Sequence, residues 1–285
     1  MPRIIPHFSV LAPGYDVLLS DVWGVVHNGV NAFPHACEAL TRAREQGAKV
    51  ILITNAPRPS AIVARQLEKL HVPRETYDAI VSSGDVTRAV IEARPGQSLF
   101  HLGPERDRSI FSGLGVHFSP LESADYVVCS GLENDETETP NDYLARLQLM
   151  RARKLFMVCA NPDVVVERGS RLIYCAGALA DLYASLGGEV LYAGKPYKPI
   201  YDLALAKAQS AAAREIPHAR VLAIGDSLRT DLTGAHAIGV DFLFVTSGIH
   251  AEELGTRAAP DAAALSAALT AAGGMPKAVM RELKW

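Results

Sequence analysis

The feature that most constrains the fold is an apolar run that ends in a carboxylate and a turn, within the stretch LLSDVWGVVHNG at residues 18–29. The run from Val17 to Leu19 predicts a buried strand that carries Asp21 to the point where the chain turns at Gly24. In α/β proteins, the carboxyl ends of parallel strands form the edge at which ligands bind. Asp21 is therefore a candidate catalytic residue, and the alternative is an aspartate that closes a turn.

The same order of strand, polar residue and helix recurs along the chain. The run KVILI at residues 49–53 ends at Thr54-Asn55, and a helix is predicted over residues 59–70. The run VLAI at residues 221–224 leads into GDSLRTD and a further helix. Successive βα units favour right-handed parallel connections, with their polar residues at one edge. The sequence thus predicts an α/β fold with a Rossmann-like doubly wound parallel sheet.

Between these two parts lies a segment with enough apolar residues for a core of its own. Further short strands are predicted at residues 98–102, 126–129 and 155–159, with helices around residues 141–151 and 176–186. We interpret residues 85–193 as an inserted α/β domain, and residues 1–84 and 194–285 as the core into which it is inserted.

Two further carboxylates, Asp226 and Asp231, lie around one strand-to-helix turn. Together with Asp21 they are placed to converge on a hard cation, and Mg²⁺ needs only a few carboxylate oxygens because it keeps several waters. The alternative for Asp231 is a helix N-cap. Thr54, at the end of its strand and just before a helix, suits an anion cradle, and here too the alternative is a helix cap.

Composition limits the class of protein. The chain has 285 residues, of which 49% are hydrophobic and 21% charged, and its formal net charge is −3, as expected for a globular protein long enough for two cores. This balance does not favour nucleic acid or an anionic membrane as a partner. No apolar run approaches the roughly 20 residues of a membrane span, and the start is a poor signal peptide. The cysteines form no CxxC pair, which suits buried thiols in the cytoplasm; they are Cys37, Cys129, Cys159 and Cys175.

Four motifs occur in the order and spacing of a known family. They are Asp21-Val22-Trp23-Gly24-Val25, Thr54-Asn55, Gly194-Lys195-Pro196, and Gly225-Asp226-Ser227 with Asp231. With these motifs the chain resembles the haloacid dehalogenase-like hydrolases, specifically the class IIA branch of sugar, nucleotide, nitrophenyl and pyridoxal-phosphate phosphatases. The resemblance covers nearly the whole chain. Within the insertion, Ala160-Asn161-Pro162-Asp163 and residues 176–180 are similar to cap sequences of that branch, so the resemblance implies that the insertion is a C2-type cap domain.

The resemblance implies a role for each motif in the Mg²⁺-dependent hydrolysis of a phosphate monoester. Asp21 would be the nucleophile that takes up the phosphoryl group as an aspartyl-phosphate. Thr54 and Asn55 would contribute the hydroxyl and backbone amides that hold phosphoryl oxygens, and Lys195 would offset their charge. The implied metal ligands are Asp21, the backbone carbonyl of Trp23, Asp226 and Asp231, the last directly or through water.

Trp23 departs from the pattern of the family's phosphatases, which usually carry a second aspartate there as general acid and base. An indole N–H does not titrate in the relevant range, so it takes neither role, although a backbone carbonyl remains for the metal. Three interpretations are open. His27 substitutes as acid and base, with a hydrogen-bonded loop histidine as its alternative. The chain is a slow or inactive phosphatase that binds phosphoesters. Or the chemistry is that of the dehalogenases, which also carry an aromatic residue here; the paired Asp226 and Asp231 disfavour this, since dehalogenation needs no metal.

The cap would close over the site as a lid and supply contacts that select the substrate, with hinges near Gly84 and Gly194. Asn161, Asp163 and Arg168 are candidate contacts in the cap, with Arg58 on the core side, and Arg168 is suited to pair with a second anionic group. Surface or turn positions are the alternative for each.

The predicted substrate is a small phosphorylated metabolite, such as a sugar phosphate or a nucleotide, in the cytoplasm. No nucleic-acid or membrane partner is expected. Caps of this type often pair, so a homodimer through the cap is open. The alternative function is a catalytically impaired protein that binds phosphoesters on the same scaffold.

Overall fold

The computed structural model spans the chain and describes residues 3–168, 171–255 and 260–285. The chain forms two compact units, of which the first comprises Met1–Thr54, Ala64–Val81 and Pro196–Trp285. The second comprises Asn55–Val63 and Ser82–Lys195. The predicted insertion therefore lies inside the second unit, which also takes in Asn55–Val63.

The first unit is built on a six-stranded sheet in the order β13-β12-β11-β1-β2-β3, and its pairs from β13 to β2 are parallel. From β1 the chain runs outward through β2 and β3, and it later returns to run outward through β11, β12 and β13 on the other side. This is a doubly wound order that reverses between β1 and β11, so the predicted α/β, Rossmann-like fold is confirmed. The strands are β1 (Val17–Asp21), β2 (Lys49–Thr54), β3 (Ala79–Ser82), β11 (Val221–Gly225), β12 (Asp241–Val245) and β13 (Ala278–Met280).

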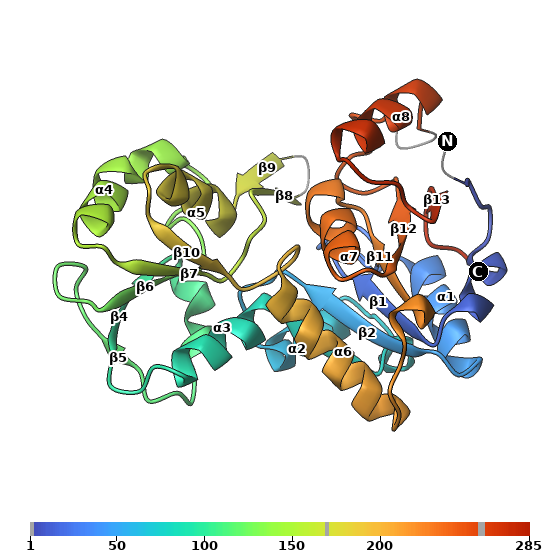
Figure 1. Cartoon of the computed structure of the whole chain (residues 1–285), viewed down its shortest axis with the longest axis horizontal. Helices are drawn as coiled ribbons and strands as arrows, with labels where there is room; N and C mark the ends of the chain where they lie inside the picture. Colours follow the sequence, from blue (N-terminus) through green and yellow to red (C-terminus); the bar gives the residue numbers. More distant parts are fainter. Residues whose placement is uncertain (1–2, 169–170, 256–259) are drawn as a thin grey trace. The chain divides into compact units, whose positions relative to one another are not determined.

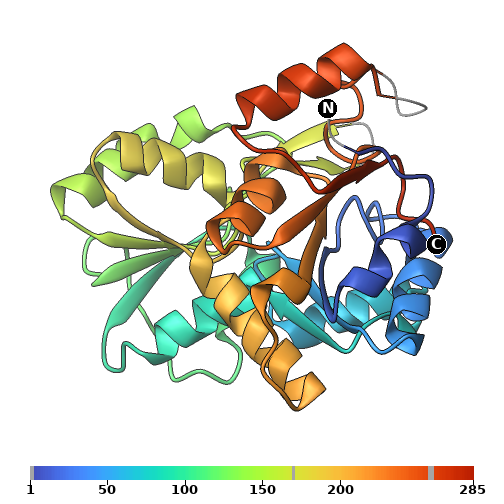
Figure 2. The ribbon, with the colours of Figure 1, turned by 45° about the vertical axis from the view of Figure 1, so that its right-hand side comes forward.

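The central strands are buried because their sequences are apolar nearly throughout. β1, β2 and β11 read VLLSD, KVILIT and VLAIG, without the polar alternation of a half-exposed strand. One helix, α6, packs across β2, as Figures 1 and 2 both show. Pro34 begins α1 with a fixed φ that suits a first helical turn. The helices of these parts of the chain are α1 (Pro34–Glu45), α2 (Ser60–Lys69), α6 (Lys198–Ala212), α7 (Thr233–Ala237) and α8 (Ala262–Ala271).

The second unit has a parallel sheet of its own, in the order β10-β7-β6-β4-β5. Successive side chains in a strand point to opposite faces, so Val127 and Met157 join the core under α4 and α5, whereas Val128 and Val158 join the core under α3. Figure 1 shows α4 and α5 on one side of this sheet and α3 on the other. The elements are α3 (Ser83–Glu92), β4 (Ser98–Leu102), β5 (His117–Phe118), β6 (Tyr126–Cys129), α4 (Leu144–Ala152), β7 (Phe156–Cys159), α5 (Ala176–Ser185) and β10 (Glu189–Tyr192).

Sequence and structure differ in the shortest elements. The sequence does not predict β5, β10, β13 or the antiparallel pair of β8 (Val165–Arg168) and β9 (Arg171–Tyr174). None of these strands exceeds 4 residues, and such a run is too short for periodicity to separate it from a loop. Within the described ranges, no helix combines the length and the apolar character needed to cross a membrane.

Candidate active site

The strand register brings three predicted site residues to one edge of the first sheet. Asp21 is the last residue of β1, and it pairs with β2 one residue before Thr54. On the other side, Ser20 pairs with Ile224 of β11, so Asp226 lies two residues beyond that pair at the same carboxyl edge. This edge is where the strand order reverses, the place at which open α/β sheets bind ligands.

Asp21, Asp226 and Asp231 converge at this edge. Each offers one carboxylate oxygen, and these oxygens lie within 4.8 Å of one another. Asp226 and Asp231 are buried, with 5% and 3% of their surface exposed. Carboxylates this close repel one another strongly away from water, and a cation between them relieves the repulsion. Hard oxygen donors fit Mg²⁺ or Ca²⁺, so the residues present fit the implied divalent cation.

Glycine backbone encloses the Asp226 carboxylate. Gly24 has a φ of +80°, and a Cβ there would lie 2.0 Å from Asp226 Oδ2. A Cβ at Gly248 would lie 1.8 Å from the same oxygen, to which the neighbouring Ile249 N–H donates at 2.8 Å. Neither position accepts a side chain unless the carboxylate moves. The turn after Asp21 is thus shaped around Asp226, which explains the glycine in the first motif.

Asp231 reaches the site from a single π-helical turn, Leu228–Leu232. The N-cap of this turn is Ser227, whose hydroxyl accepts from the Thr230 N–H at 3.3 Å, so the alternative of Asp231 as the N-cap is wrong. The Asp231 carboxylate instead accepts from the Ser227 N–H at 3.1 Å. Wide turns of this kind recur at functional sites, and here the turn brings Asp231 beside the other two carboxylates.

The segment after β12 also supports the site, a contribution that the sequence does not predict. His250 Nε2 accepts from the Leu228 N–H at 3.2 Å, and His250 Nδ1 lies 2.8 Å from Glu253 Oε2. The ring thus holds the start of the π-helical turn, while Ile249 donates to Asp226. The available signal is position alone, because this segment follows a buried strand at the carboxyl edge of the sheet.

Trp23 and His27 pack together in the turn after Asp21. Their ring centroids lie 5.2 Å apart at an interplanar angle of 71°, and a Cβ on Gly29 would lie 2.4 Å from the indole. His27 is 2% exposed, and its Nδ1 accepts from the Gly29 N–H at 2.9 Å. Burial lowers the pKa of His27 to about 4. These contacts match the loop-histidine alternative, and a role for His27 as acid and base stays a prediction.

Asn55 and Lys195 are the first and last residues of the second unit, and hydrogen bonds of the Asn55 side chain join them. Its Oδ1 accepts from the Lys195 N–H at 2.7 Å, and its Nδ2 donates to the Lys195 carbonyl at 3.1 Å and to Asp163 Oδ1 at 2.9 Å. A Cβ on Gly194 would lie 2.3 Å from Asn55 Oδ1, so only glycine permits this approach. The structure therefore brings Asn55, Asp163 and the backbone of the buried Lys195 together.

The remaining predicted substrate contacts also belong to the second unit. Asn161 is buried, and its Oδ1 accepts from the Asp163 N–H at 3.1 Å, which closes a turn. Arg58 Nε donates to Asp107 Oδ1 at 3.3 Å. Arg168 ends β8, but its side chain lies outside the described residues, so its contact with substrate stays a prediction.

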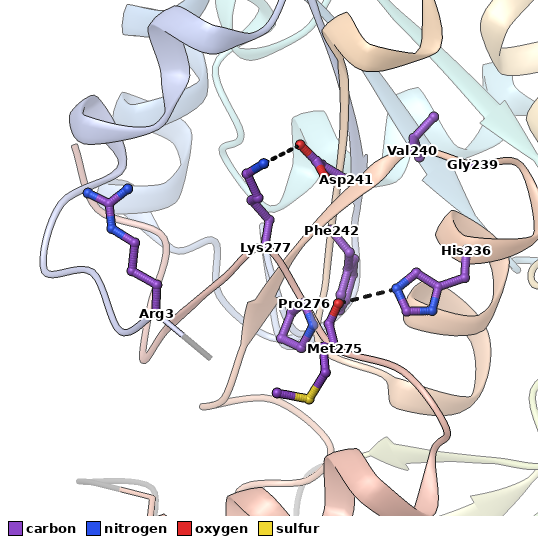
Figure 3. A pocket seen from close by; sticks show the side chains of 9 residues that line it. All are labelled: Arg3, His236, Gly239, Val240, Asp241, Phe242, Met275, Pro276 and Lys277. Carbon is purple, nitrogen blue, oxygen red and sulfur yellow. Dashed lines mark hydrogen bonds and ion pairs between the residues drawn. The ribbon is translucent and has the colours of Figure 1, made fainter. Parts of the chain in front are cut away.

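A cavity of about 580 Å³ lies at the amino ends of β12 and β13, and Figure 3 shows the side chains that line it. Lys277 pairs there with Asp241 at 3.2 Å, and Asp241 also accepts from the Tyr15 hydroxyl at 2.6 Å. Because the strands are parallel, this is the edge opposite the three carboxylates. The cavity is therefore separate from the candidate active site.

Comparison with known proteins agrees with this geometry. Residues 18–117 match a family model described as haloacid dehalogenase-like hydrolase, and residues 192–272 match one described as HAD-hydrolase-like. A crystal structure of a haloacid dehalogenase-like hydrolase from Brucella suis is 44% identical, with a TM-score of 0.87, over 99% of this chain and 100% of that one. A 5′-nucleotidase from Bacillus subtilis is 24% identical over 84% of this chain and 90% of its own. A glycerol phosphate phosphatase from Mycobacterium tuberculosis, solved with calcium, is 26% identical, with a TM-score of 0.63, over 84% of this chain and 68% of that one.

Proposed function

Because the chain belongs to the haloacid dehalogenase-like hydrolases, we propose that it hydrolyses phosphate monoesters of small metabolites with the help of a bound Mg²⁺. The observation that carries this proposal is the convergence of Asp21, Asp226 and Asp231 at the carboxyl ends of β1 and β11. The relatives described as a 5′-nucleotidase and a glycerol phosphate phosphatase support the class of substrate.

The three carboxylates and the backbone carbonyl of Trp23 would hold the cation. When bound, it supplies positive charge that offsets the repulsion between a carboxylate nucleophile and a phosphate. The glycine enclosure of Asp226 supports this ligand set, because it fixes one carboxylate in place in advance.

Asp21 acts as the nucleophile in this proposal. One of its carboxylate oxygens forms a bond to phosphorus while the bond from phosphorus to the ester oxygen breaks, and the leaving oxygen takes up a proton. Water then attacks the phosphorus of the aspartyl-phosphate, which releases phosphate and restores the carboxylate. The Val22 N–H donates to Asp21 Oδ1 at 2.7 Å and so orients the carboxylate.

Thr54, Asn55 and Lys195 bind the transferring phosphoryl group. The Thr54 hydroxyl and the backbone amides beside it donate to phosphoryl oxygens, and the Lys195 ammonium offsets their charge. The burial of Thr54 at the end of β2 and the pair of hydrogen bonds from Asn55 to the Lys195 backbone support these roles. Fixed donors of this kind stabilise charge in a transition state because they need no reorganisation.

Trp23 favours a second candidate function, a phosphoester-binding protein with little or no turnover. The indole occupies the position of the usual acid and base, and it packs on Gly29 and His27. Loss of a positioned acid and base lowers rates by about 10²- to 10⁴-fold. If the chain does turn over substrate, the leaving group takes its proton from water or from a group other than Trp23.

The test is release of phosphate from a panel of phosphate monoesters with Mg²⁺, comparing the native chain with Asp21→Asn. We expect the variant to lose turnover, since an amide is a poor nucleophile and a poor Mg²⁺ ligand. Asp202→Asn is the matched control, because Asp202 is exposed and pairs only with Lys198 on α6 among the described contacts. Unchanged turnover in Asp21→Asn would show that the nucleophile is wrongly assigned.

Trp23→Asp separates the two candidate functions. If the native chain is inert and Trp23→Asp releases phosphate, the binding function is supported, because the native scaffold lacks only the acid and base. A native chain with measurable turnover supports the hydrolase. Loss of that turnover in His27→Ala, with the fold retained, supports His27 as the substitute.

The remaining assignments belong to the same proposal. Asn161, Asp163 and Arg168 select the substrate from the cap, residues 85–193, and a homodimer forms through that cap. The four cysteines are buried and unbridged, which suits a reducing compartment such as the cytoplasm.

A further inference from the structure

The second sheet has its own point of reversal. From β4 the chain continues to β5 on one side, while β6, β7 and β10 follow on the other. The carboxyl ends of β4 and β6 therefore flank the place at which open α/β sheets bind ligands. Gly103 and Gly131 follow these strands with φ values of +154° and +156°, and a Cβ on Gly103 would lie 2.1 Å from Ser130 Oγ.

A series of hydrogen-bonded polar side chains, His101, Ser130, Asp107 and Arg58, occupies this place. His101 Nε2 lies 2.9 Å from Ser130 Oγ, and the Ser130 side chain hydrogen-bonds to Asp107. Asp107 is 2% exposed and accepts from Arg58 Nε at 3.3 Å. Burial raises the pKa of the Asp107 carboxyl, although the charges of Arg58 and Arg106 act in the opposite direction. A carboxylate whose pKa is raised by burial does not stabilise the fold through its charge, so its contacts favour a role in orienting Arg58.

Arg58 is the solvent-accessible end of this series of hydrogen-bonded side chains. Its side chain is 31% exposed, whereas that of Asp107 is 3% exposed. A guanidinium has five N–H donors in a planar fork, and the bond to Asp107 uses the one on Nε. The terminal amino groups are suited to a second, bidentate interaction with a carboxylate or a phosphate. Asp107 thus fixes the plane of the fork without occupying all of it.

The covalent chain limits how far Arg58 lies from the phosphoryl-binding residues. Arg58 is four residues after Thr54, and an extended chain spans at most about 3.6 Å per residue, so their backbones lie within roughly 14 Å of one another. This upper limit, together with the length of an arginine side chain, allows the two ends of one small metabolite to reach both residues.

On the premise of the proposed function, we propose that Arg58 is a specificity-determining residue that binds a second anionic group on the non-reacting part of the substrate. Asp107, backed by Ser130 and His101, is the positioning residue that fixes the guanidinium. The substrate class is then a phosphate monoester that also carries a carboxylate or a second phosphate.

The test compares esters in matched pairs. Glycerate 3-phosphate and glycerol 3-phosphate differ by a carboxylate, so this pair measures the effect of a carboxylate. Fructose 1,6-bisphosphate and fructose 6-phosphate measure the effect of a second phosphate. The quantity measured is the ratio of kcat/KM within each pair for the native chain, Arg58→Gln, Arg58→Lys and Asp107→Asn. Arg146→Gln is the control, because Arg146 also lies in the second unit and pairs with the exposed Glu133.

We expect the native chain to prefer the doubly anionic ester of at least one pair by about 10-fold or more, the size typical of a charged hydrogen-bonded contact. Arg58→Gln should abolish that preference. Arg58→Lys should keep part of it, since a charge remains without the fork. Asp107→Asn should weaken the preference without lowering the melting temperature, a result that a purely structural role does not give. Arg146→Gln should leave the ratio unchanged.

A native chain without preference in either pair, or an Arg58→Gln variant with a ratio within twofold of native, overturns the inference. The ratio of binding affinities within each pair is also measured by calorimetry, so the role of Arg58 is tested even if the protein hydrolyses no ester. In that case the proposed hydrolysis fails, whereas a binding preference that disappears in Arg58→Gln retains the role of Arg58.

Discussion

At the scale of single residues, the candidate site depends on glycine where a carboxylate needs room. Asp226 lies against the backbones of Gly24 and Gly248, and it accepts from the Ile249 N–H. This contact removes freedom from the carboxylate before a ligand binds, which is how rigid sites gain affinity and rate. The glycines are therefore as much a part of the site as the aspartates are.

Gly24→Ala tests this contact. We expect the concentration of Mg²⁺ needed for half-maximal activity to rise by about 10-fold or more, because a Cβ displaces Asp226 Oδ2. Gly47→Ala is the matched control, since Gly47 has a φ of +100° but its Cβ would meet nothing within 4 Å. Both variants bear a backbone strain of about 1 kcal/mol. An equal Mg²⁺ requirement in the two variants would contradict the steric argument.

His27→Ala separates support of the loop from proton transfer. The change deletes a buried ring beneath Trp23 and leaves the Gly29 N–H without its acceptor. We expect a loss of about 2–4 kcal/mol in the free energy of unfolding, from the cavity and the lost hydrogen bond together. Thermal unfolding measures it. If the melting temperature stays at the native value while turnover falls, the His27 ring takes part in proton transfer and does not stabilise the loop.

At the scale of elements, long apolar strands are what made the fold predictable. VLLSD and KVILIT end in Asp21 and Thr54, and Asp226 directly follows VLAIG, so register alone brings the three residues to one edge. The π-helical turn Leu228–Leu232 was out of reach, because its composition does not differ from that of an α-helix. The donor on Ile249 was missed for another reason, since a backbone N–H leaves no mark in a sequence.

The contacts of Arg58 and Asn55 show a further limit of prediction. Arg58 meets Asp107 and Asn55 meets Lys195, at separations of 49 and 140 residues. No local pattern relates such residues, so only the folded sheet of the second unit brings them together. The sequence singles out Arg58, Asn55 and Lys195 individually but carries no signal that pairs them.

Asn55→Ala tests the junction at the end of β2. The variant leaves the Lys195 N–H and carbonyl without their side-chain partners. We expect kcat to fall by about 10- to 100-fold with a smaller change in KM, because the Lys195 ammonium loses its placement rather than its charge. Exchange of the Lys195 amide with deuterium should also accelerate. Asn141→Ala, at an exposed asparagine, is the control. If the Lys195 amide of Asn55→Ala is protected from exchange as in the native chain, Asn55 does not hold the Lys195 backbone.

At the scale of the whole molecule, stability should fall with acid in two separate ranges. Burial lowers the pKa of His101 to about 4, so between pH 6.5 and that value the unfolded chain binds a proton that the folded chain does not. Stability from this source is present above pH 6.5 and is lost as the pH falls toward 4. Arg220 and Arg214 lower the pKa of Asp16 to about 2, so its contribution is lost between about pH 4 and 2.

Melting temperatures from pH 8 to 2 measure both ranges. His101→Gln should reduce the loss of stability between pH 6.5 and 4 by an amount on the order of 2 kcal/mol. A slope should remain in this range, because burial also lowers the pKa of His27 to about 4. Asp16→Asn should flatten the curve below pH 4 and leave the upper range as in the native chain. If the His101→Gln curve runs parallel to the native curve above pH 4, protonation of His101 does not destabilise the folded protein in this range.

The hydrogen bonds between Asn55 and the Lys195 backbone have a consequence for how such proteins diversify. They join the first and the last residue of the second unit, with Ala64–Val81 of the first unit lying between them in the sequence. A unit whose first and last residues are joined is suited to exchange between relatives, provided that β3, which lies between these residues in the sequence, is exchanged with it. Grafting the stretch from Asn55 to Lys195, with β3 included, from relatives that act on other esters is thus a practical route to new substrate preferences on one set of three aspartates.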